Sequence, residues 1–385
     1  NLYFLAKILV QEGCDVTIFS LRRPEIYQGE LFKGANFVYY TANKFKNLKI
    51  KLRLLKQKFI HIIGIDTGII EAEKFASILN VPYSFLSYEI FFDHELKKLK
   101  NKTYINLKNK SRKACKGIQF AIIQDEIRKN LLSNEYGIEK DKILLMPVAG
   151  SDKRVIPKSD YFYQHLNIPS DRKILLYIGW MDDIQLKRLI EHVNFLPSKW
   201  VLVIHSRYKY IGKIPDGFPA NKIYFSFNKP IESIDKIGIL LGGCDAGFCS
   251  YEASYDTPYT GDNIKYIGLS SGKTTTFLQY GIPVVVENMN LWNEIVKNNK
   301  IGFELRKKSD LMQLNKLLEN DIKQNCFTYF DKYLDINNFM GGIFSAIQNN
   351  TPPRKINKKQ FALFYGVEMM LIVIMVLKKI KKHIK

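Results

Sequence analysis

The sequence has few cysteines, and none lies where a zinc site or a disulfide framework would need it. The five cysteines among the 385 residues are Cys14, Cys115, Cys244, Cys249 and Cys326. No two of them form a CxxC pair, and no cluster of histidine and cysteine has the spacing of metal ligands. An odd, scattered set of cysteines is typical of a reduced, cytosolic protein. The sequence therefore gives no indication of a structural metal or of a secreted, disulfide-bonded domain.

Acidic residues are scarce relative to basic ones. The chain has 37 aspartates and glutamates against 58 lysines and arginines, a formal net charge of +21. Such an excess predicts an anionic partner, which is nucleic acid, an acidic membrane surface or a phosphorylated substrate. A lysine-rich coding background accounts for the excess equally well. Because no helix-turn-helix, zinc-finger or RNP-type motif is present, we expect no nucleic-acid partner.

The rest of the composition is ordinary, and the pattern along the chain alternates between strands and helices. Helical stretches such as Gly68–Leu79 and Leu96–Ala114 separate short apolar runs, which predicts an α/β protein with parallel sheets. The expected strands are Asp15–Leu21, Asn36–Tyr40, Phe59–Ile65, Tyr83–Tyr88, Phe120–Gln124 and Ile143–Pro147, then Lys173–Ile178, Trp200–His205, Ile223–Phe227, Ile239–Leu241, Ala246–Cys249 and Pro283–Glu287.

A polar segment at 149–160 divides these strands into two arrays and is typical of a linker. We therefore expect two Rossmann-like domains that face a cleft, over residues 1–150 and 151–327. A crossover helix over residues 328–350 is expected to return to the first domain. The chain opens directly on a helical segment, Leu2–Glu12, so we expect the first strand of the N-terminal domain and its glycine-rich loop to be missing.

One stretch, Tyr266–Asn288, carries the clearest chemistry. A Gly/Ser loop, Gly268–Gly272, leads into Lys273 and a helix. Small residues let the backbone approach a ligand closely, and a helix N-terminus presents free N–H groups that favour a diphosphate. The stretch is not a Walker loop, because Gly268 is one residue too close to Gly272. Taken alone, the Gly-Lys pair is also compatible with a solvated helix cap.

The surrounding sequence resembles the donor-binding half of GT-B glycosyltransferases, and most of all the bacterial family 4-like (group 1) enzymes of surface-polysaccharide synthesis. The residues that carry this resemblance are Cys244–Phe248 (CDAGF), Gly281, Pro283 and Val284 in a GxPVV turn, Tyr177–Gly179 and Trp200–Ser206. The resemblance implies sugar transfer from a nucleotide-sugar, with no cofactor and no metal. It implies donor contacts from Gly179, Ser270, Ser271, Gly272, Lys273 and Thr274. Arg207 and Lys209 follow the strand that ends at His205, and we expect them to neutralise the donor phosphates, with a solvated basic loop as the alternative.

The sequence departs from this family at two positions. Many members carry two glutamates eight residues apart, where this chain has Gly268 and Thr276. Glu252 or Glu287 is a possible substitute for the missing carboxylate. A non-catalytic nucleotide-sugar-binding protein of the same fold is therefore the alternative to a transferase.

Two carboxylates at strand ends are the candidate catalytic residues. Glu89 follows the strand at Tyr83–Tyr88, and we expect it in the cleft between the domains. Asp66 ends the strand at Phe59–Ile65, where we expect it to contact the acceptor. For Glu89, a carboxylate on the surface at a strand end is an equally good interpretation.

The last segment, 351–385, is basic and apolar. Its apolar run, Phe361–Leu377, is interrupted only by Gly366 and Glu368, and lysines flank it on both sides. The run is near the shortest length that spans a bilayer, and lysines are attracted to anionic lipid. We therefore expect an apolar tail helix that attaches the protein to the cytoplasmic face of the inner membrane, beside a lipid-linked or saccharide acceptor. A helix that docks on the protein itself is the alternative.

Overall fold

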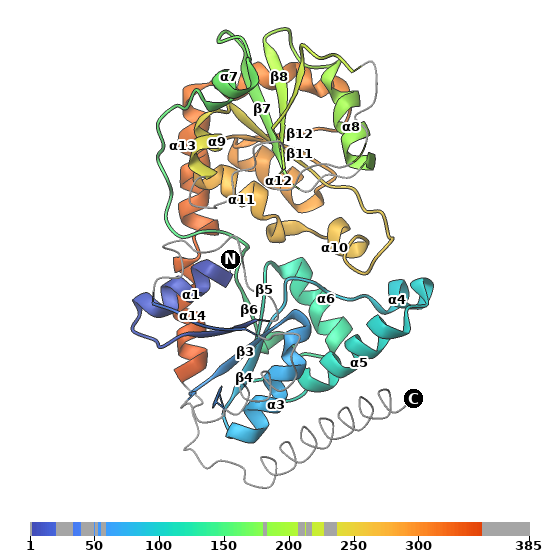
Figure 1. Cartoon of the computed structure of the whole chain (residues 1–385), viewed down its shortest axis with the longest axis vertical. Coiled ribbons are helices and arrows are strands. Elements are labelled where there is room, and N and C mark those ends of the chain that lie inside the picture. The colour runs from blue at the N-terminus through green and yellow to red at the C-terminus, as the bar shows by residue number, and fades with distance from the viewer. Residues whose placement is uncertain are drawn as a thin grey trace, which may run out of the picture.

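The computed structural model describes residues 2–20, 34–39, 50, 53–54, 59–179, 183–206, 212, 218–226 and 237–348. These residues form two α/β units, one above the other in Figure 1. Arg207, Lys209 and the tail segment Phe361–Leu377 lie outside the described residues. Within the described residues, no helix is long and apolar enough to cross a membrane.

The first unit holds a four-stranded parallel sheet in the order β3-β4-β5-β6 and a separate parallel pair, β1-β2. Its elements are α1 (Leu2–Gln11), β1 (Thr17–Ser20), β2 (Asn36–Tyr39), β3 (Ile62–Ile65), η2 (Asp66–Gly68), α3 (Ile69–Leu79), β4 (Tyr83–Leu86), α4 (Asp93–Leu99), α5 (Lys102–Cys115), β5 (Ala121–Ile123), α6 (Glu126–Tyr136), η3 (Lys140–Lys142) and β6 (Ile143–Leu145).

The second unit holds a six-stranded parallel sheet in the order β12-β11-β10-β7-β8-β9. Its elements are α7 (Tyr161–Leu166), β7 (Lys173–Ile178), α8 (Asp183–Val193), β8 (Trp200–His205), β9 (Ile223–Phe225), α9 (Ile237–Gly242), β10 (Ala246–Ser250), α10 (Asp262–Lys265), η5 (Gly268–Ser270), α11 (Gly272–Gln279), β11 (Val284–Glu287), α12 (Asn290–Asn299), β12 (Gly302–Glu304), η6 (Lys308–Leu318) and α13 (Asn320–Tyr329). The strand order reverses between β7 and β10, as in a doubly wound Rossmann sheet.

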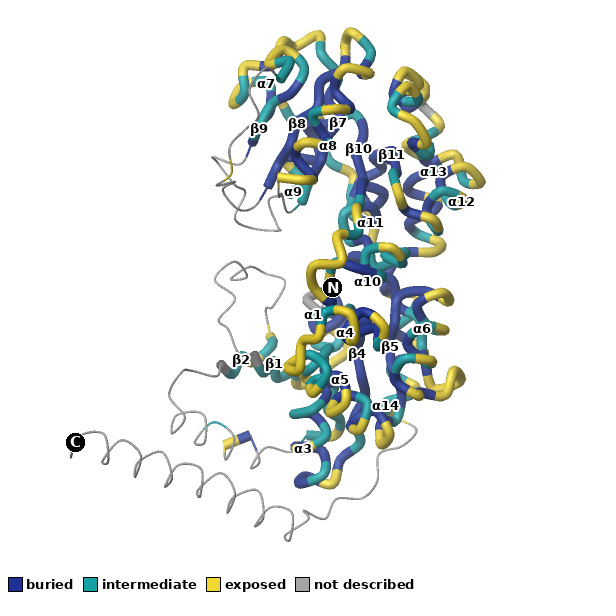
Figure 2. The backbone as a smooth tube through the Cα atoms, turned by 90° about the vertical axis from the view of Figure 1, so that its right-hand side faces the viewer, coloured by how far each residue is buried: buried dark blue, intermediate teal, exposed yellow. Residues whose placement is uncertain are grey.

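The central strands of the two larger sheets are deeply buried (Figure 2), and the six-stranded sheet is covered on both faces. Alternate residues of β7 show this directly. Ile174 and Leu176 belong to the core on one face of the sheet, whereas Leu175 and Tyr177 belong to the core on the other face. A strand buried on both sides has no polar alternation, which explains the continuous apolar runs of the sequence.

The expected fold class, two Rossmann-like α/β domains, is confirmed, but two local expectations are wrong. Ile239–Leu241 is part of helix α9 and not a strand. A short apolar run has no periodicity that separates a buried strand from a buried helix. The single helix expected at Leu96–Ala114 is divided into α4 and α5, because Lys100 adopts a left-handed conformation and Asn101 caps the new helix.

The chain passes between the units twice, near residues 150–152 and again near residues 335–336, and the two crossings contact each other. After α13, a π-helical turn, η7 (Phe330–Leu334), leads into α14 (Asn337–Gln348). Asp335 accepts a hydrogen bond from the Asp152 N–H at 3.0 Å, and the Ile336 N–H donates to the Gly150 carbonyl at 3.2 Å. α14 then packs on the first unit, in a buried cluster with α1 and the strands β4 and β5.

We expect Ile343→Ala on α14 to lower the free energy of unfolding by about 2–5 kcal/mol, because the side chain is fully buried in that cluster. Gly341→Ala on the same helix is the control. A Cβ added there meets nothing within 4 Å, so this change is expected to raise stability slightly. Chemical denaturation of both variants measures the difference, and equal stability of the two would contradict the packing of α14.

Candidate active site

The carboxyl ends of β7 and β10, where the strand order reverses, meet the N-terminus of α11. β7 is followed by Gly179, whose backbone N–H donates to the His205 carbonyl at 3.1 Å. A Cβ added to Gly179 would lie 3.3 Å from Nζ of Lys273 and 3.2 Å from the hydroxyl of Tyr177. The absence of a side chain at Gly179 therefore leaves room for the lysine. The structure brings together Gly179 and Lys273, which the sequence analysis named separately.

The Lys273 ammonium lies between two aromatic rings. Its Nζ is 4.3 Å from the centroid of the Tyr177 ring and 4.2 Å from that of the Tyr251 ring. Burial lowers the pKa of Lys273 to about 8. In the described part of the chain, no carboxylate forms an ion pair with it. A partly dehydrated cation that has cation–π contacts and no carboxylate partner is suited to bind an anion.

The hydroxyls beside Lys273 hold the site together. Ser271 is fully buried, and its Oγ lies 3.0 Å from Oη of Tyr251 and 2.7 Å from Oγ1 of Thr274. Ser271 and Thr274, both named in the sequence analysis, therefore fix the Tyr251 ring and the start of α11. Gly272 and Lys273 occupy the first turn of α11, where backbone N–H groups have no partner inside the helix. Ser270 ends the 3₁₀ turn just before that helix.

The two positions where the family's glutamates are missing have physical explanations. A Cβ at Gly268 would lie 2.2 Å from Oδ2 of Asp125, and the φ of Gly268 is +44°. Only glycine fits this position. Oδ2 of Asp125 instead accepts the Leu269 N–H at 2.9 Å, which ties the loop to the first unit. The hydroxyl of Thr276 donates to the Gly272 carbonyl at 2.6 Å, inside its own helix.

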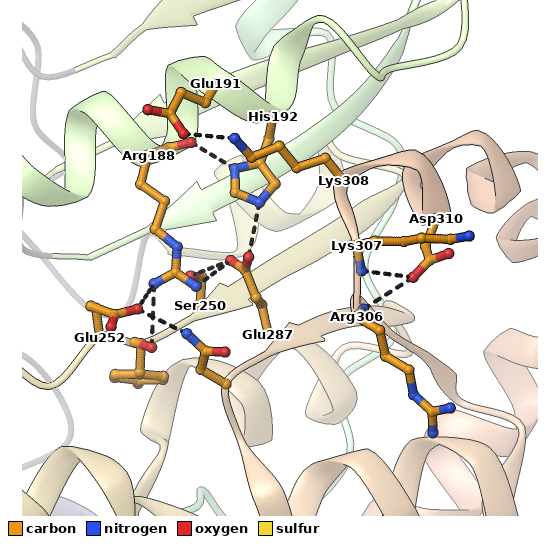
Figure 3. Close-up of polar contacts among 12 residues, drawn as sticks. Arg188, Glu191, His192, Ser250, Glu252, Glu287, Arg306, Lys307, Lys308 and Asp310 are labelled. Carbon is orange, nitrogen blue, oxygen red and sulfur yellow. Dashed lines mark hydrogen bonds and ion pairs between the residues drawn. The ribbon is translucent and has the colours of Figure 1, made fainter.

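Glu252 and Glu287 were the two possible substitutes for the missing glutamates. The carboxylate of Glu287 is already bound by neighbouring side chains. Figure 3 shows it at the end of β11 between α8 and β10. His192 Nε2 lies 2.9 Å from one carboxylate oxygen, and Arg188 Nη2 at 2.9 Å and Ser250 Oγ at 2.8 Å contact the other. Burial alone would raise the pKa of Glu287, but His192, Arg188 and Ser250 together hold it below its usual value. The carboxylate of Glu287 is thus already paired inside the second unit, between β11, β10 and α8.

Glu252 is the substitute that remains open to a ligand. Its side chain is 48% exposed, and it forms an ion pair with Arg188 and accepts a hydrogen bond from Asn288 at 2.8 Å. It lines a cavity of about 200 Å³ with Tyr251, Tyr255 and Asn288. Tyr251 forms part of this wall and also contacts Lys273, so the cavity adjoins the lysine.

The carboxylates at the strand ends of the first unit form a second cluster. Asp66 has a φ of +47°, and its Oδ1 accepts hydrogen bonds from the N–H groups of Tyr88 at 2.8 Å and Glu89 at 3.0 Å. Burial raises the pKa of Asp66 to about 6 and that of Glu89 to about 7, and the charge on Asp66 adds to the rise at Glu89. Glu89 is half-buried, so it is not the freely solvated carboxylate of the alternative interpretation.

Arg128, which the sequence analysis missed, connects this cluster to the second unit. Its fully buried guanidinium donates to the Tyr88 carbonyl at 2.7 Å, next to Glu89, and to the Tyr266 carbonyl at 3.1 Å. In the sequence, Arg128 is one of many basic residues on a helix, and only its burial distinguishes it. Through Arg128 and Asp125, the loop before α11 rests on the strand ends that carry Glu89.

Comparison with known proteins gives a fold and no close relative. No family model and no curated protein matches the sequence. The solved structure of WaaG, a glycosyltransferase involved in lipopolysaccharide biosynthesis, is similar with a TM-score of 0.62 and 12% identity, covering 91% of this chain and 95% of that one. The Anabaena protein HepE in complex with UDP and glucose gives a TM-score of 0.60 at 12% identity, over 88% of this chain and 100% of that one. Sucrose-phosphate synthase from Thermosynechococcus elongatus gives 0.59 at 12% identity, over 88% and 90%.

The chain has the GT-B fold. In GT-B terms, the first unit corresponds to the N-terminal domain and the second to the C-terminal domain, and the sheet crevice of the second holds Gly179 and Lys273. The similarity in fold to these three structures and the geometry at Lys273 are separate observations.

We expect Lys273→Met to bind a nucleoside diphosphate at least tenfold more weakly than the wild-type protein, because the charge-assisted contact to phosphate is lost. The same change removes a charge that burial disfavours, so the variant should unfold at the same temperature as the wild-type protein or at a higher one. Isothermal titration and thermal unfolding measure the two effects. Unchanged affinity would contradict the assignment, and a lower unfolding temperature would show that the lysine is structural.

Proposed function

We propose that this GT-B protein is a glycosyltransferase that moves a sugar from a nucleotide-sugar to a saccharide or lipid-linked acceptor in cell-surface polysaccharide biosynthesis. The observation that carries the proposal is the unpaired Lys273 ammonium beside Gly179 at the switch point of the second sheet. The solved complexes of the similar protein HepE contain UDP and glucose, which supports a nucleotide-sugar as the donor.

In this proposal, the second domain binds the diphosphate and stabilises it as it leaves. The Lys273 ammonium and the N–H groups in the first turn of α11 contact the phosphates. Negative charge increases there as the bond between the anomeric carbon of the sugar and the diphosphate oxygen breaks. Glu252, which lines the adjoining cavity, takes the carboxylate contact to the donor that Gly268 and Thr276 do not supply. Neither a metal nor a cofactor takes part in this step.

The first domain supplies carboxylates that change protonation near neutral pH. Glu89 and Asp66 interact with each other, so their protons leave in coupled steps. The second of these steps leaves Glu89 charged, able to accept a proton from an acceptor hydroxyl or to stabilise positive charge on the donor sugar. We also propose that the anomeric configuration is retained, as the resemblance to family 4-like enzymes implies.

A non-catalytic nucleotide-sugar-binding protein is the second candidate, and the glycine and threonine at the glutamate positions favour it. The two functions differ in one measurement. A transferase releases the nucleoside diphosphate from a bound nucleotide-sugar when acceptor extract is added, whereas a binding protein returns the nucleotide-sugar intact.

We expect Glu89→Gln to lower kcat for transfer at least 100-fold and to leave the affinity for nucleoside diphosphate unchanged. For the wild-type protein, kcat should rise with pH through about 7, because the charged form of Glu89 accumulates as the pH passes its pKa. Glu126→Gln, a change to an exposed glutamate on α6, is the matched control and should behave as the wild type. A pH profile of Glu89→Gln that kept the wild-type rise would exclude Glu89 as the group responsible.

We propose further that the tail brings the protein to the cytoplasmic face of the inner membrane, where a lipid-linked acceptor is available. The support is the apolar run at Phe361–Leu377 between clusters of lysine. Deleting residues 352–385 should move the protein from the membrane fraction to the soluble fraction and leave nucleotide binding intact. Full-length protein that is soluble in low salt without detergent would contradict this attachment.

A further inference from the structure

Three side chains that the proposed transfer does not use gather where α4 of the first unit meets α10 of the second. His94 and Glu95 belong to α4, and Asp262 is the first residue of α10. One possible metal-ligand atom from each lies within 4.8 Å of the other two. Among the described residues, this is the one cluster of three or more histidine, cysteine or acidic side chains with such a spacing.

Glu95 is buried without a full set of partners. Its residue is only 4% exposed. Oε1 accepts the Asp262 N–H at 2.5 Å, but within the described part of the chain Oε2 has no hydrogen-bond partner. A buried carboxylate oxygen that lacks a partner costs free energy, so either a proton or a cation must compensate it. Burial accordingly raises the pKa of Glu95, and the charge of Asp262 adds to the rise.

The backbone of the second unit makes room for this carboxylate. A Cβ on Gly261 would lie 2.1 Å from Oε1 of Glu95, so a side chain at that position would displace the glutamate. The next residue, Asp262, uses Oδ1 to accept the Tyr255 hydroxyl at 3.0 Å, while its Oδ2 lies 3.4 Å from Nε2 of His94. Oε2 of Glu95, Oδ2 of Asp262 and Nε2 of His94 are therefore available to a ligand.

Two basic residues of the adjacent helix α5 form ion pairs outside the cluster. Lys108 forms ion pairs with Asp93 and Glu135, and Arg112 forms one with Asp93. His94, which is positive only when protonated, is the partner of Asp262 within the cluster. Lys265, at the other end of α10, also interacts electrostatically with Asp262. The side chain of His94 is 64% exposed, so the cluster opens to solvent on this side.

We propose that His94, Glu95 and Asp262 bind a divalent transition-metal ion, for which Zn²⁺ is the best probe. Imidazole nitrogen and carboxylate oxygen are both Zn²⁺ ligands, and water from the open side would complete a tetrahedral site with three protein ligands. The ion neutralises the two neighbouring carboxylates. This site lies outside the transfer chemistry, so the expectation that transfer itself needs no metal is unaffected.

The ion would act as a clamp between the two units. Next to the cluster, the side chain of Asn263 already pairs with the backbone of Ile90, donating to its carbonyl and accepting from its N–H, both at 2.8 Å. Ile90 follows Glu89 directly. A metal that joins α4 to α10 therefore holds the second unit against the strand end that carries Glu89.

The test is a titration of the metal-free full chain with Zn²⁺, read by competition with a chromogenic chelator. We expect one Zn²⁺ per chain, and at least tenfold weaker binding in each of His94→Ala, Glu95→Gln and Asp262→Asn. His165→Ala removes a histidine on α7 outside the cluster and should bind as the wild type does. Mg²⁺ at equal concentration should not compete, because an imidazole ligand favours Zn²⁺.

Thermal unfolding separates loss of the site from loss of the fold. Glu95→Gln removes a buried charge, so the metal-free variant should be at least as stable as the metal-free wild type. Zn²⁺ should raise the unfolding temperature of the wild type and of His165→Ala, but not of Glu95→Gln. The proposal is overturned if no stoichiometric binding occurs, if the three variants bind as tightly as the wild type, or if Mg²⁺ competes equally.

Discussion

The site depends on one cation that has no counter-ion in the described structure. Lys273 is held between the rings of Tyr177 and Tyr251 and against the bare backbone of Gly179. These contacts fix the position of the ammonium but do not neutralise it. Its pKa is lowered because burial disfavours the charged form, and a phosphate would reverse that effect. An anion bound at this position is what we propose, and it would restore the charge that burial disfavours.

The placement of that cation relative to the first domain follows from a second constraint. The loop before α11 has no freedom to carry a large side chain at Gly268, because Asp125 of the first domain occupies the space. Asp125 and Arg128 of the first unit contact the loop, and Trp292 of α12 in the second unit donates to the Gly268 carbonyl at 2.7 Å. The same contacts that leave no room for the family's first glutamate thus connect the loop before α11 to the strand end that carries Glu89.

The sequence predicted the fold class, and it named two residues that the structure brings together, because both inferences rest on local patterns. Continuous apolar runs separated by helices indicate parallel sheets, and a Gly/Ser loop before a lysine indicates a helix N-terminus. Gly179 and Lys273 were named from separate motifs, and the reversal of strand order brings them together. The prediction of a strand at Ile239–Leu241 was wrong, because a short apolar run does not distinguish a strand from a helix.

The remaining features depend on contacts between residues far apart in the chain. Nothing local marks Tyr251 as the wall of the lysine site, Arg128 as the bridge between domains, or Glu287 as already paired with Arg188 and His192. Glu252 and Glu287 were equal candidates in the sequence, and only their partners separate them. Arg207 and Lys209 lie outside the described residues and stay predictions.

The most direct test of the account is the titration of Lys273 itself, followed by NMR with a ¹³C label at its ε carbon and assigned by the Lys273→Met variant. The account predicts that the pKa of this lysine is near 8 in the free protein. It should rise toward the ordinary value, about 10.4, or beyond when a nucleoside diphosphate is added at saturation. A lysine that titrates at the same pH with and without the nucleotide would contradict the claim that Lys273 binds the diphosphate.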